Sequence, residues 1–205
     1  MYLPESFKIV DEPEIEAFLQ RYDFATIVSP TLMATHVPVV VRRAGSGLVV
    51  LGHVARANSH WKSMDGTVES LAIFHGPHGY VSPTWYANSP AVPTWNYAVV
   101  HVYGRPLARE EPAFIEDVLG DLLKRYEGSG PDAWRMEELP LDYRTRQLSR
   151  IVGFEMSVVR LEAKFKLGQN RAAVDRIRTI EELERKDSLE ASNLAEFMRS
   201  HLKDD

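Results

Sequence analysis

The sequence contains no cysteine, and this absence removes several kinds of chemistry at once. A chain without cysteine has no disulfide framework, no thiolate metal ligand and no cysteine nucleophile. Its composition fits a reducing compartment such as the cytoplasm. The first residues, 1–6, also lack the basic and apolar segments of a secretory signal peptide. We therefore expect a cytoplasmic protein.

Long hydrophobic runs and an excess of basic charge are absent as well. No apolar stretch approaches the roughly 20 residues that cross a bilayer, so no membrane segment is predicted. Lysine and arginine number 24 against 29 acidic residues, which gives a net charge of −5. A broad nucleic-acid surface usually needs a basic face, so this balance weighs against direct DNA binding. The 205 residues are enough for one large domain, and we expect residues 1–205 to form it.

The hydrophobic pattern predicts a mainly β fold with peripheral helices. Segments rich in β-branched and aromatic residues predict strands over 24–29, 33–41, 48–55, 69–75, 80–82, 95–104 and 151–166. We interpret Gly76-Pro77-His78-Gly79 as a break between two strands, and Gly45-Ser46-Gly47 as a hairpin turn. Few helices lie between these segments, which favours six to seven antiparallel strands in a sheet or barrel over βαβ units.

Helices are predicted at both ends of this strand-rich region and within it. Asp11 can cap a helix whose apolar face repeats through Tyr22, and residues 58–64 suit a short helix. An amphipathic segment at 111–127 and a shorter one near 143–150 form a helical insertion over about 111–150. The tail from about 171 to 205 also has a helical pattern.

The segment 92–104 carries more polar groups than a strand that only fills a core needs. Trp95 and Tyr97 offer ring faces, while Asn96 and His101 offer hydrogen-bonding groups. Each buried donor or acceptor must find a partner. Apolar faces with a few placed polar groups suit a planar heteroaromatic ligand.

A second segment, 51–62, ends a strand and enters the short helix. Arg56, Asn58, Ser59 and Lys62 lie at that helix start. Free backbone N–H groups and cations there could bind a phosphate. The alternative is a capped surface helix with two solvated cations.

Other polar residues carry weaker signals. His75 and His78 lie on a strand-to-turn segment and lack an evident third metal ligand, so no metal site is predicted. Trp85 suits either the core or a pocket wall. Lys164 and Lys166 alternate before a turn that contains Gln169, which is typical either of a strand exit or of a clamp on a ligand or dimer partner.

Taken together, these segments resemble the PaiB family of FMN-binding negative transcriptional regulators. The resemblance rests on motifs that follow one another through nearly the whole chain: Met1-Tyr2-Leu3-Pro4 with Phe7, Thr35-His36-Val37-Pro38, Gly52-His53-Val54-Ala55-Arg56-Ala57-Asn58, Phe74-His75-Gly76-Pro77-His78-Gly79-Tyr80-Val81-Ser82-Pro83, Pro93-Thr94-Trp95-Asn96-Tyr97 with Val100-His101, and Lys164-Phe165-Lys166-Leu167-Gly168-Gln169-Asn170. Gly168 departs from the family, which usually has serine there.

The resemblance implies an FMN-binding split β-barrel that pairs as a homodimer, with the flavin at the subunit interface. From residue type and position, we expect these residues to contact the flavin: Arg56, Asn58 and Lys62 for the phosphate, Trp85, Trp95 and Tyr97 as ring walls, and Asn96, His101, Lys166 and Gln169 as polar partners. The regulatory role comes from the resemblance alone, since no helix-turn-helix is evident.

Three alternatives stay open at this point. One is an FMN-dependent oxidoreductase or flavin reductase with His101 or Tyr97 as its proton donor. Another is a haem- or metal-binding split barrel that uses His53, His75, His78 or His101. A third is a dimeric sensor of a small-molecule ligand, in which the flavin site is vestigial.

Overall fold

The computed structural model describes residues 1–45 and 47–202, so Ser46 of the predicted turn and the end of the predicted tail lie outside it. Its strands are β1 (Lys8–Ile9), β2 (Phe24–Val28), β3 (Ala34–Ala44), β4 (Gly47–Ala55), β5 (Ser70–Val81), β6 (Thr94–Arg109) and β7 (Ile151–Lys166). Its helices are α1 (Glu12–Arg21), α2 (Pro112–Tyr126), α3 (Leu141–Leu148), α4 (Ala173–Glu184) and α5 (Leu189–Ser200), with 3₁₀ turns η1 (Glu5–Phe7), η2 (Ser59–Ser63), η3 (Pro83–Trp85) and η4 (Met136–Glu138).

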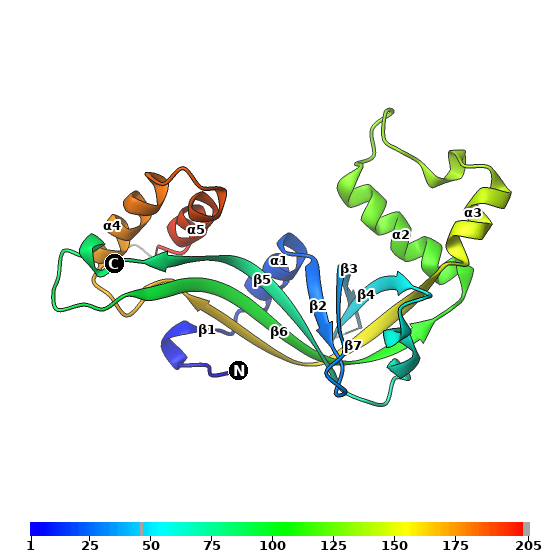
Figure 1. Cartoon of the computed structure of the whole chain (residues 1–205), viewed down its shortest axis with the longest axis horizontal. Coiled ribbons are helices and arrows are strands. Elements are labelled where there is room, and N and C mark those ends of the chain that lie inside the picture. The colour runs from blue at the N-terminus through cyan, green and yellow to red at the C-terminus, as the bar shows by residue number, and fades with distance from the viewer. Residues whose placement is uncertain (46, 203–205) are drawn as a thin grey trace. The chain divides into compact units, whose positions relative to one another are not determined.

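The strands form one sheet in the order β1-β7-β4-β3-β2-β5-β6 (Figure 1). A further pairing between β6 and β7 closes β2 to β7 into a barrel. The predicted mainly β fold with a six- to seven-stranded antiparallel barrel is therefore confirmed. The chain divides into two compact units. We call residues 19–74 and 101–161 the barrel unit, and residues 1–18, 75–100 and 162 onwards the terminal unit.

The barrel unit is built from short antiparallel pairings. β2 pairs with β3 and with the start of β5, β3 pairs with β4, and β4 pairs with the first half of β7. Side chains that alternate inward along these strands are fully buried; the largest include Ile27, Phe74, Phe154 and Met156.

Helix α2 covers part of the barrel unit with one apolar stripe. Ile115, Val118 and Leu122 are buried, as the helical spacing predicts. Beside this stripe, Asp117 and Asp121 accept hydrogen bonds from Arg42 of β3 at 2.6 and 2.7 Å. These ion pairs are partly exposed to solvent, so they add little to the free energy of unfolding. Their main effect is to fix the orientation of α2.

The terminal unit contains β1, the outer parts of β5, β6 and β7, and the helices α4 and α5 (Figure 1). Its core centres on Phe165 of β7, whose ring lies 5.0 Å from the ring of Phe18 and 5.2 Å from that of Phe197. Asp175 of α4 holds the loop between β5 and β6 by accepting hydrogen bonds from the Ala87 and Asn88 amides. Burial alone would raise the pKa of Asp175, but hydrogen bonds from this loop outweigh it and lower that pKa.

The predicted break at 76–79 is wrong, because β5 runs without interruption from Ser70 to Val81. Gly76 is needed for close packing: a Cβ there would lie 2.6 Å from the Phe18 ring and 3.2 Å from the Ala98 carbonyl oxygen. Gly76 and Pro77 are both buried, which interrupts the alternation of the strand and is typical of a β-bulge. The two-residue strand β1 was not predicted, since it is too short to show a period.

Gly104 allows β6 and β7 to approach each other in the barrel unit. A Cβ at this position would lie 2.5 Å from the Ser157 carbonyl oxygen and 2.7 Å from the Met156 side chain. A backbone atom cannot move aside as the end of a flexible side chain can, so any larger residue would separate the two strands.

We expect Gly104→Ala to lower the free energy of unfolding by about 1–3 kcal/mol through overpacking. Gly120→Ala is the matched control, since a Cβ on this α2 glycine meets nothing within 4 Å. The control should raise stability by about 0.5–1 kcal/mol, because alanine favours helix. Chemical denaturation of both variants measures the difference, and equal stabilities would contradict a close β6–β7 approach.

Candidate functional site

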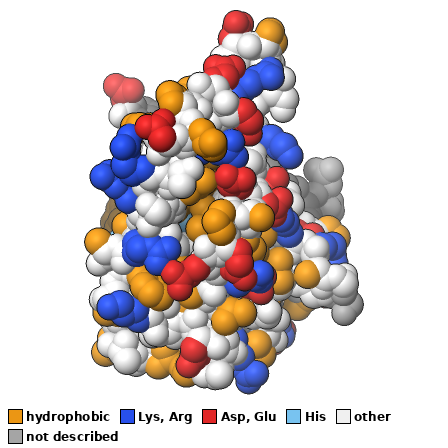
Figure 2. All heavy atoms as spheres, turned by 90° about the vertical axis from the view of Figure 1, so that its right-hand side faces the viewer, with side chains coloured by type: hydrophobic (Ala, Val, Ile, Leu, Met, Phe, Trp, Pro, Cys, Tyr) orange, Lys and Arg blue, Asp and Glu red, His pale blue; other side chains and the backbone are white. Residues whose placement is uncertain are grey.

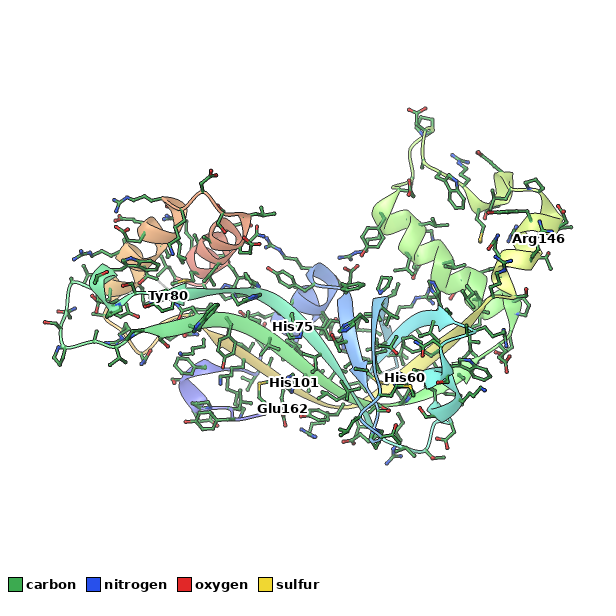
Figure 3. All side chains as sticks on the ribbon, in the orientation of Figure 1. His60, His75, Tyr80, His101, Arg146 and Glu162 are labelled. Atoms are coloured by element: carbon green, nitrogen blue, oxygen red, sulfur yellow. The ribbon has the colours of Figure 1, made fainter. Side chains whose placement is uncertain are left out.

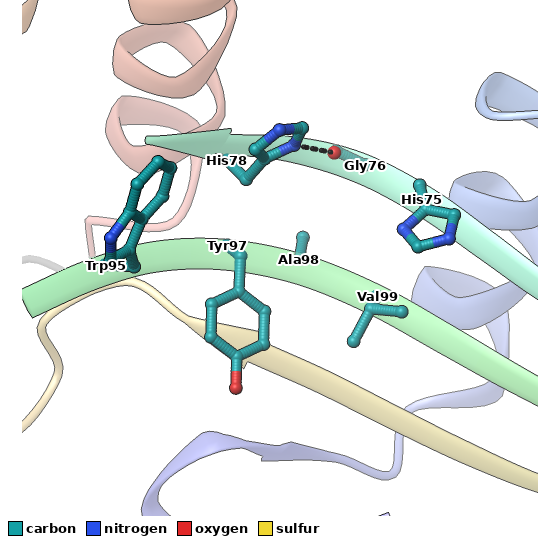
Figure 4. A pocket seen from close by; sticks show the side chains of 7 residues that line it. All are labelled: His75, Gly76, His78, Trp95, Tyr97, Ala98 and Val99. Atoms are coloured by element: carbon teal, nitrogen blue, oxygen red, sulfur yellow. Dashed lines mark hydrogen bonds between the residues drawn. The ribbon is translucent and has the colours of Figure 1, made fainter. Parts of the chain in front are cut away.

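A pocket of about 380 Å³ lies between β5 and β6 of the terminal unit (Figure 4). Most of its lining is apolar, with two imidazoles, an indole and a phenol among the side chains. The lining residues are His75, Gly76, His78, Trp95, Tyr97, Ala98 and Val99. The pocket therefore combines broad ring faces with a few polar atoms, as a site for a planar ligand requires.

Trp95 presents much of its indole to solvent, with 54% of the residue exposed. Its ring stacks with His78 at 6.4 Å between centroids and 28° between planes. The Tyr80 ring meets the indole edge-on at 6.3 Å. These neighbours hold the orientation of Trp95 while leaving ring surface uncovered.

Tyr97 lies on the same face of β6 as Trp95, because side chains two residues apart share a face. The ammonium of Lys164 lies 5.2 Å from the centre of the Tyr97 ring and also 5.2 Å from that of Tyr2. Lys164 is only 6% exposed and donates to the Tyr2 carbonyl oxygen at 3.0 Å. A buried cation thus supports the Tyr97 side of the pocket.

In the turn after β7, the side chain of Gln169 forms hydrogen bonds with the nearby backbone. Gln169 accepts from the Leu167 amide at 2.8 Å and donates to the Phe165 carbonyl oxygen at 2.5 Å. Gly168 has φ of +82°, a conformation that favours glycine and accounts for its place in the turn. Lys166 donates to the Trp95 carbonyl oxygen at 2.9 Å, which ties the turn to the start of β6.

Asn96 and Trp85 are not placed with the pocket lining. Asn96 lies on the opposite, buried face of β6, where its amide donates to the Met198 sulfur of α5 at 3.4 Å. Trp85 ends η3, and the Lys186 ammonium lies 4.7 Å from its ring centre. Both residues therefore have partners inside the terminal unit, and their flavin roles stay predictions.

The residues predicted to bind phosphate lie together in the barrel unit. Arg56 donates to the Ser149 and Ile151 carbonyl oxygens and to Glu110. It thereby joins the end of β4 to the start of β7, and its guanidinium also lies over Trp61 at 5.9 Å. These contacts give Arg56 a structural role, while its phosphate role stays a prediction.

Asn58 belongs to a small network at the start of η2. Its carbonyl accepts from the His60 amide at 3.0 Å, and its amide donates to the Thr35 hydroxyl at 3.1 Å. The Thr35 hydroxyl in turn meets His60 Nδ1 at 2.8 Å. Lys62 is exposed on the same turn. Arg56, Asn58 and Lys62 are neighbours in the sequence, and binding of a phosphate by them stays a prediction.

The histidines of the barrel unit occupy different settings. His101 lies on β6 outside the pocket lining, with its ring 6.2 Å from that of Tyr103. His60 is almost fully buried, and burial lowers its pKa; both histidines are labelled in Figure 3. Within residues 1–45 and 47–202, no group of three or more His, Asp or Glu side chains is arranged to hold a metal ion.

His75 and His78 line the pocket but were not among the predicted flavin-contacting residues. In a regular strand, residues three apart point to opposite faces. The buried pair Gly76 and Pro77 shifts the alternation by one residue, so both imidazoles reach the exposed face. The Gly-Pro pair within a strand pattern is the sequence signal that could have revealed this arrangement.

Solved structures share this fold at low sequence identity. The flavocytochrome Anf3 of Azotobacter vinelandii aligns with a TM-score of 0.59 and 15% identity, over 79% of this chain and 70% of that chain. The FAD and heme binding protein of Mycobacterium smegmatis aligns with a TM-score of 0.58 and 14% identity, over 83% and 78%. The fold is therefore that of the split β-barrels.

Sequence comparison places the chain within this class. A family model described as "Putative FMN-binding domain" matches residues 1–160. The Bacillus subtilis protein "Protease synthase and sporulation protein PAI 2" is 34% identical over 206 residues, which cover 99% of each chain. The chain belongs to the PaiB family of FMN-binding-domain proteins. Among its described residues, no helix is long and apolar enough to cross a membrane.

The buried histidines of the barrel unit predict a loss of stability in mild acid. His53 Nδ1 is buried without a hydrogen-bond partner among the described residues, and burial lowers the pKa of His53. The folded state therefore favours neutral His53, so stability is lost as pH falls through the unfolded value of about 6.5. The slope is at most about 1.4 kcal/mol per pH unit for each such histidine.

We expect His53→Gln to flatten this slope between neutral pH and about pH 5. The control is His36→Gln, which replaces an exposed histidine of β3. Urea unfolding at stepped pH values measures the free energy of each protein. Parallel curves for wild type and His53→Gln would refute the assignment.

Proposed function

We propose that this protein is a PaiB-like regulator that binds FMN, with the isoalloxazine ring against the β5–β6 pocket. One observation carries the proposal: Trp95 and Tyr97 present ring faces on one side of a strand, beside an apolar cavity. Such a surface is costly to leave in water and suits a flat heteroaromatic ring. Membership of an FMN-binding-domain family supports the same ligand.

The donors around the pocket suit the polar edge of a flavin. An imidazole ring carries two nitrogens that can hydrogen-bond, and His75 and His78 lie on the exposed face beside the aromatic rings. Lys164 adds a buried positive charge behind Tyr97. A positive charge near the flavin ring would favour the reduced, anionic flavin. Proteins commonly tune a flavin through charges of this kind.

The phosphate of FMN also needs cations. Of the three residues predicted to bind it, only Lys62 is in the exposed class. We further propose a homodimer in which the flavin lies at the interface between two copies, as the resemblance to the PaiB family implies. A half-covered indole such as Trp95 is typical of residues buried on association.

The charge pattern supports indirect regulation of transcription. On the face shown in Figure 2, acidic and basic side chains are interspersed with hydrophobic ones. The net charge of −5 adds no general attraction for DNA. We propose that repression proceeds through a partner or metabolite rather than through direct contact with an operator.

Flavin titration tests the binding proposal. FMN should bind the wild type more tightly than riboflavin, and Trp95→Ala should weaken FMN binding about tenfold or more, because stacking on an aromatic residue is worth about 1–3 kcal/mol. Phe24→Ala is the control, since Phe24 is also an exposed aromatic residue but lies in the barrel unit. Quenching of flavin fluorescence reports each affinity.

The same titration separates the parts of the proposal. Lys62→Ala should weaken FMN but leave riboflavin unchanged if Lys62 meets the phosphate. Wild-type affinity in Trp95→Ala would disprove the pocket assignment, and failure of the wild type to bind FMN would disprove the cofactor. Size-exclusion chromatography with light scattering tests the homodimer independently.

Indirect regulation predicts that the protein, with and without FMN, gives no electrophoretic shift of promoter fragments even at low salt. Electrostatic DNA binding strengthens steeply as salt is lowered, so this condition is the most permissive one. A shift that vanishes at higher salt would show direct binding and contradict indirect repression.

A further inference from the structure

A second cavity, of about 390 Å³, lies in the barrel unit among α2, η4, α3 and the start of β7. Its apolar lining comes from Leu119 of α2, Leu148 of α3 and Ile151 at the start of β7, with Met136 from η4. None of its lining residues belongs to the β5–β6 pocket. The cavity is large enough for a small organic molecule.

Two half-exposed aromatic residues stand in the same wall. Trp134 is 47% exposed and Tyr143 is 43% exposed, and both line the cavity. Rigid rings of this kind supply contact area at low cost in conformational entropy. They suit a ligand with a flat or branched apolar body.

The charged groups in the wall are basic. Arg144 and Arg150 line the cavity together with the amide of Gln147. Arg144 pairs with Glu116 through Nη2 at 2.8 Å. Its Nε is buried and has no hydrogen-bond partner within the described part of the chain. Arginine carries five N–H donors, so the pair with Glu116 does not use the whole hydrogen-bonding capacity of this guanidinium.

We propose that this cavity binds a small organic anion, an aromatic or branched apolar body carrying one carboxylate. The carboxylate would pair with the guanidinium groups of Arg144 and Arg150, while the body would lie against Trp134 and Tyr143. A neutral ligand would forgo the charge-assisted bond, and a cation would meet two guanidinium groups against one carboxylate. The site would give the proposed regulator an input separate from its flavin.

Calorimetric titration with 2-naphthoate and with the uncharged 2-naphthalenemethanol tests this site. Both probes have the same fused rings, so their difference isolates the carboxylate. We expect 2-naphthoate to bind about tenfold or more tightly than the alcohol, as a hydrogen bond between charged groups allows. Arg144→Met should abolish this preference while leaving the binding of the alcohol nearly unchanged.

Two further variants keep the result interpretable. Arg146→Met makes the same change of charge on the same helix, at a residue outside the cavity lining (labelled in Figure 3), and should leave the preference intact. Glu116→Gln breaks the ion pair of Arg144 without removing its Nε, so it should bind 2-naphthoate equally or more tightly. Circular dichroism shows whether each variant is folded, and weaker binding of 2-naphthoate by a folded Glu116→Gln variant would overturn the proposal.

Three other outcomes also overturn it. Equal binding of the two probes would mean that the cavity recognises only apolar surface. Failure of both probes to bind would mean that the cavity is not a ligand site. An equal loss in Arg144→Met and Arg146→Met would mean that general surface charge, rather than the guanidinium of Arg144 in the cavity wall, attracts the anion.

Discussion

The close approach of β6 and β7 at Gly104 is the constraint on which the barrel depends. Without a side chain at this position, the backbone of one strand can lie against the carbonyl oxygen of Ser157 on the other. The pairing leaves no open edge between these strands, which removes the unpaired backbone groups that an open sheet exposes. The same strand carries Trp95 and Tyr97 near its start and Gly104 further along. One strand thus contributes both to closure of the barrel and to the lining of the pocket.

Polar residues that look like ligands in the sequence often satisfy the protein's own backbone here. Arg56 meets two carbonyl oxygens at the junction of β4 and β7, and Gln169 meets an amide and a carbonyl within its own turn. Strand ends leave such groups without ladder partners, and they must be paired wherever water is excluded. Residue type therefore shows that a side chain can form hydrogen bonds. It does not show whether the partner is a ligand phosphate or a main-chain carbonyl of the protein.

Regular periods made much of the fold predictable. The spacing of Ile115, Val118 and Leu122 predicted α2, and the strand content of 95–104 predicted the main part of β6. The site was less predictable because its lining depends on which face each residue occupies. Alternation along β6 separates Asn96 from Trp95 and Tyr97, whereas the sequence interpretation grouped them by chemistry. The bulge at Gly76 and Pro77 was mistaken for a chain break, since glycine and proline mark both.

Because of that bulge, the number of residues in β5 matters for the pocket as much as their identity. Before Gly76 and Pro77, the even-numbered residues of β5 are the buried ones; after this pair, buried residues are odd-numbered. Deleting one of the two residues in the gene would restore a single phase and turn one of the two imidazoles, His75 or His78, toward the core. Evolution can therefore exchange residues along this strand far more readily than it can add or remove one.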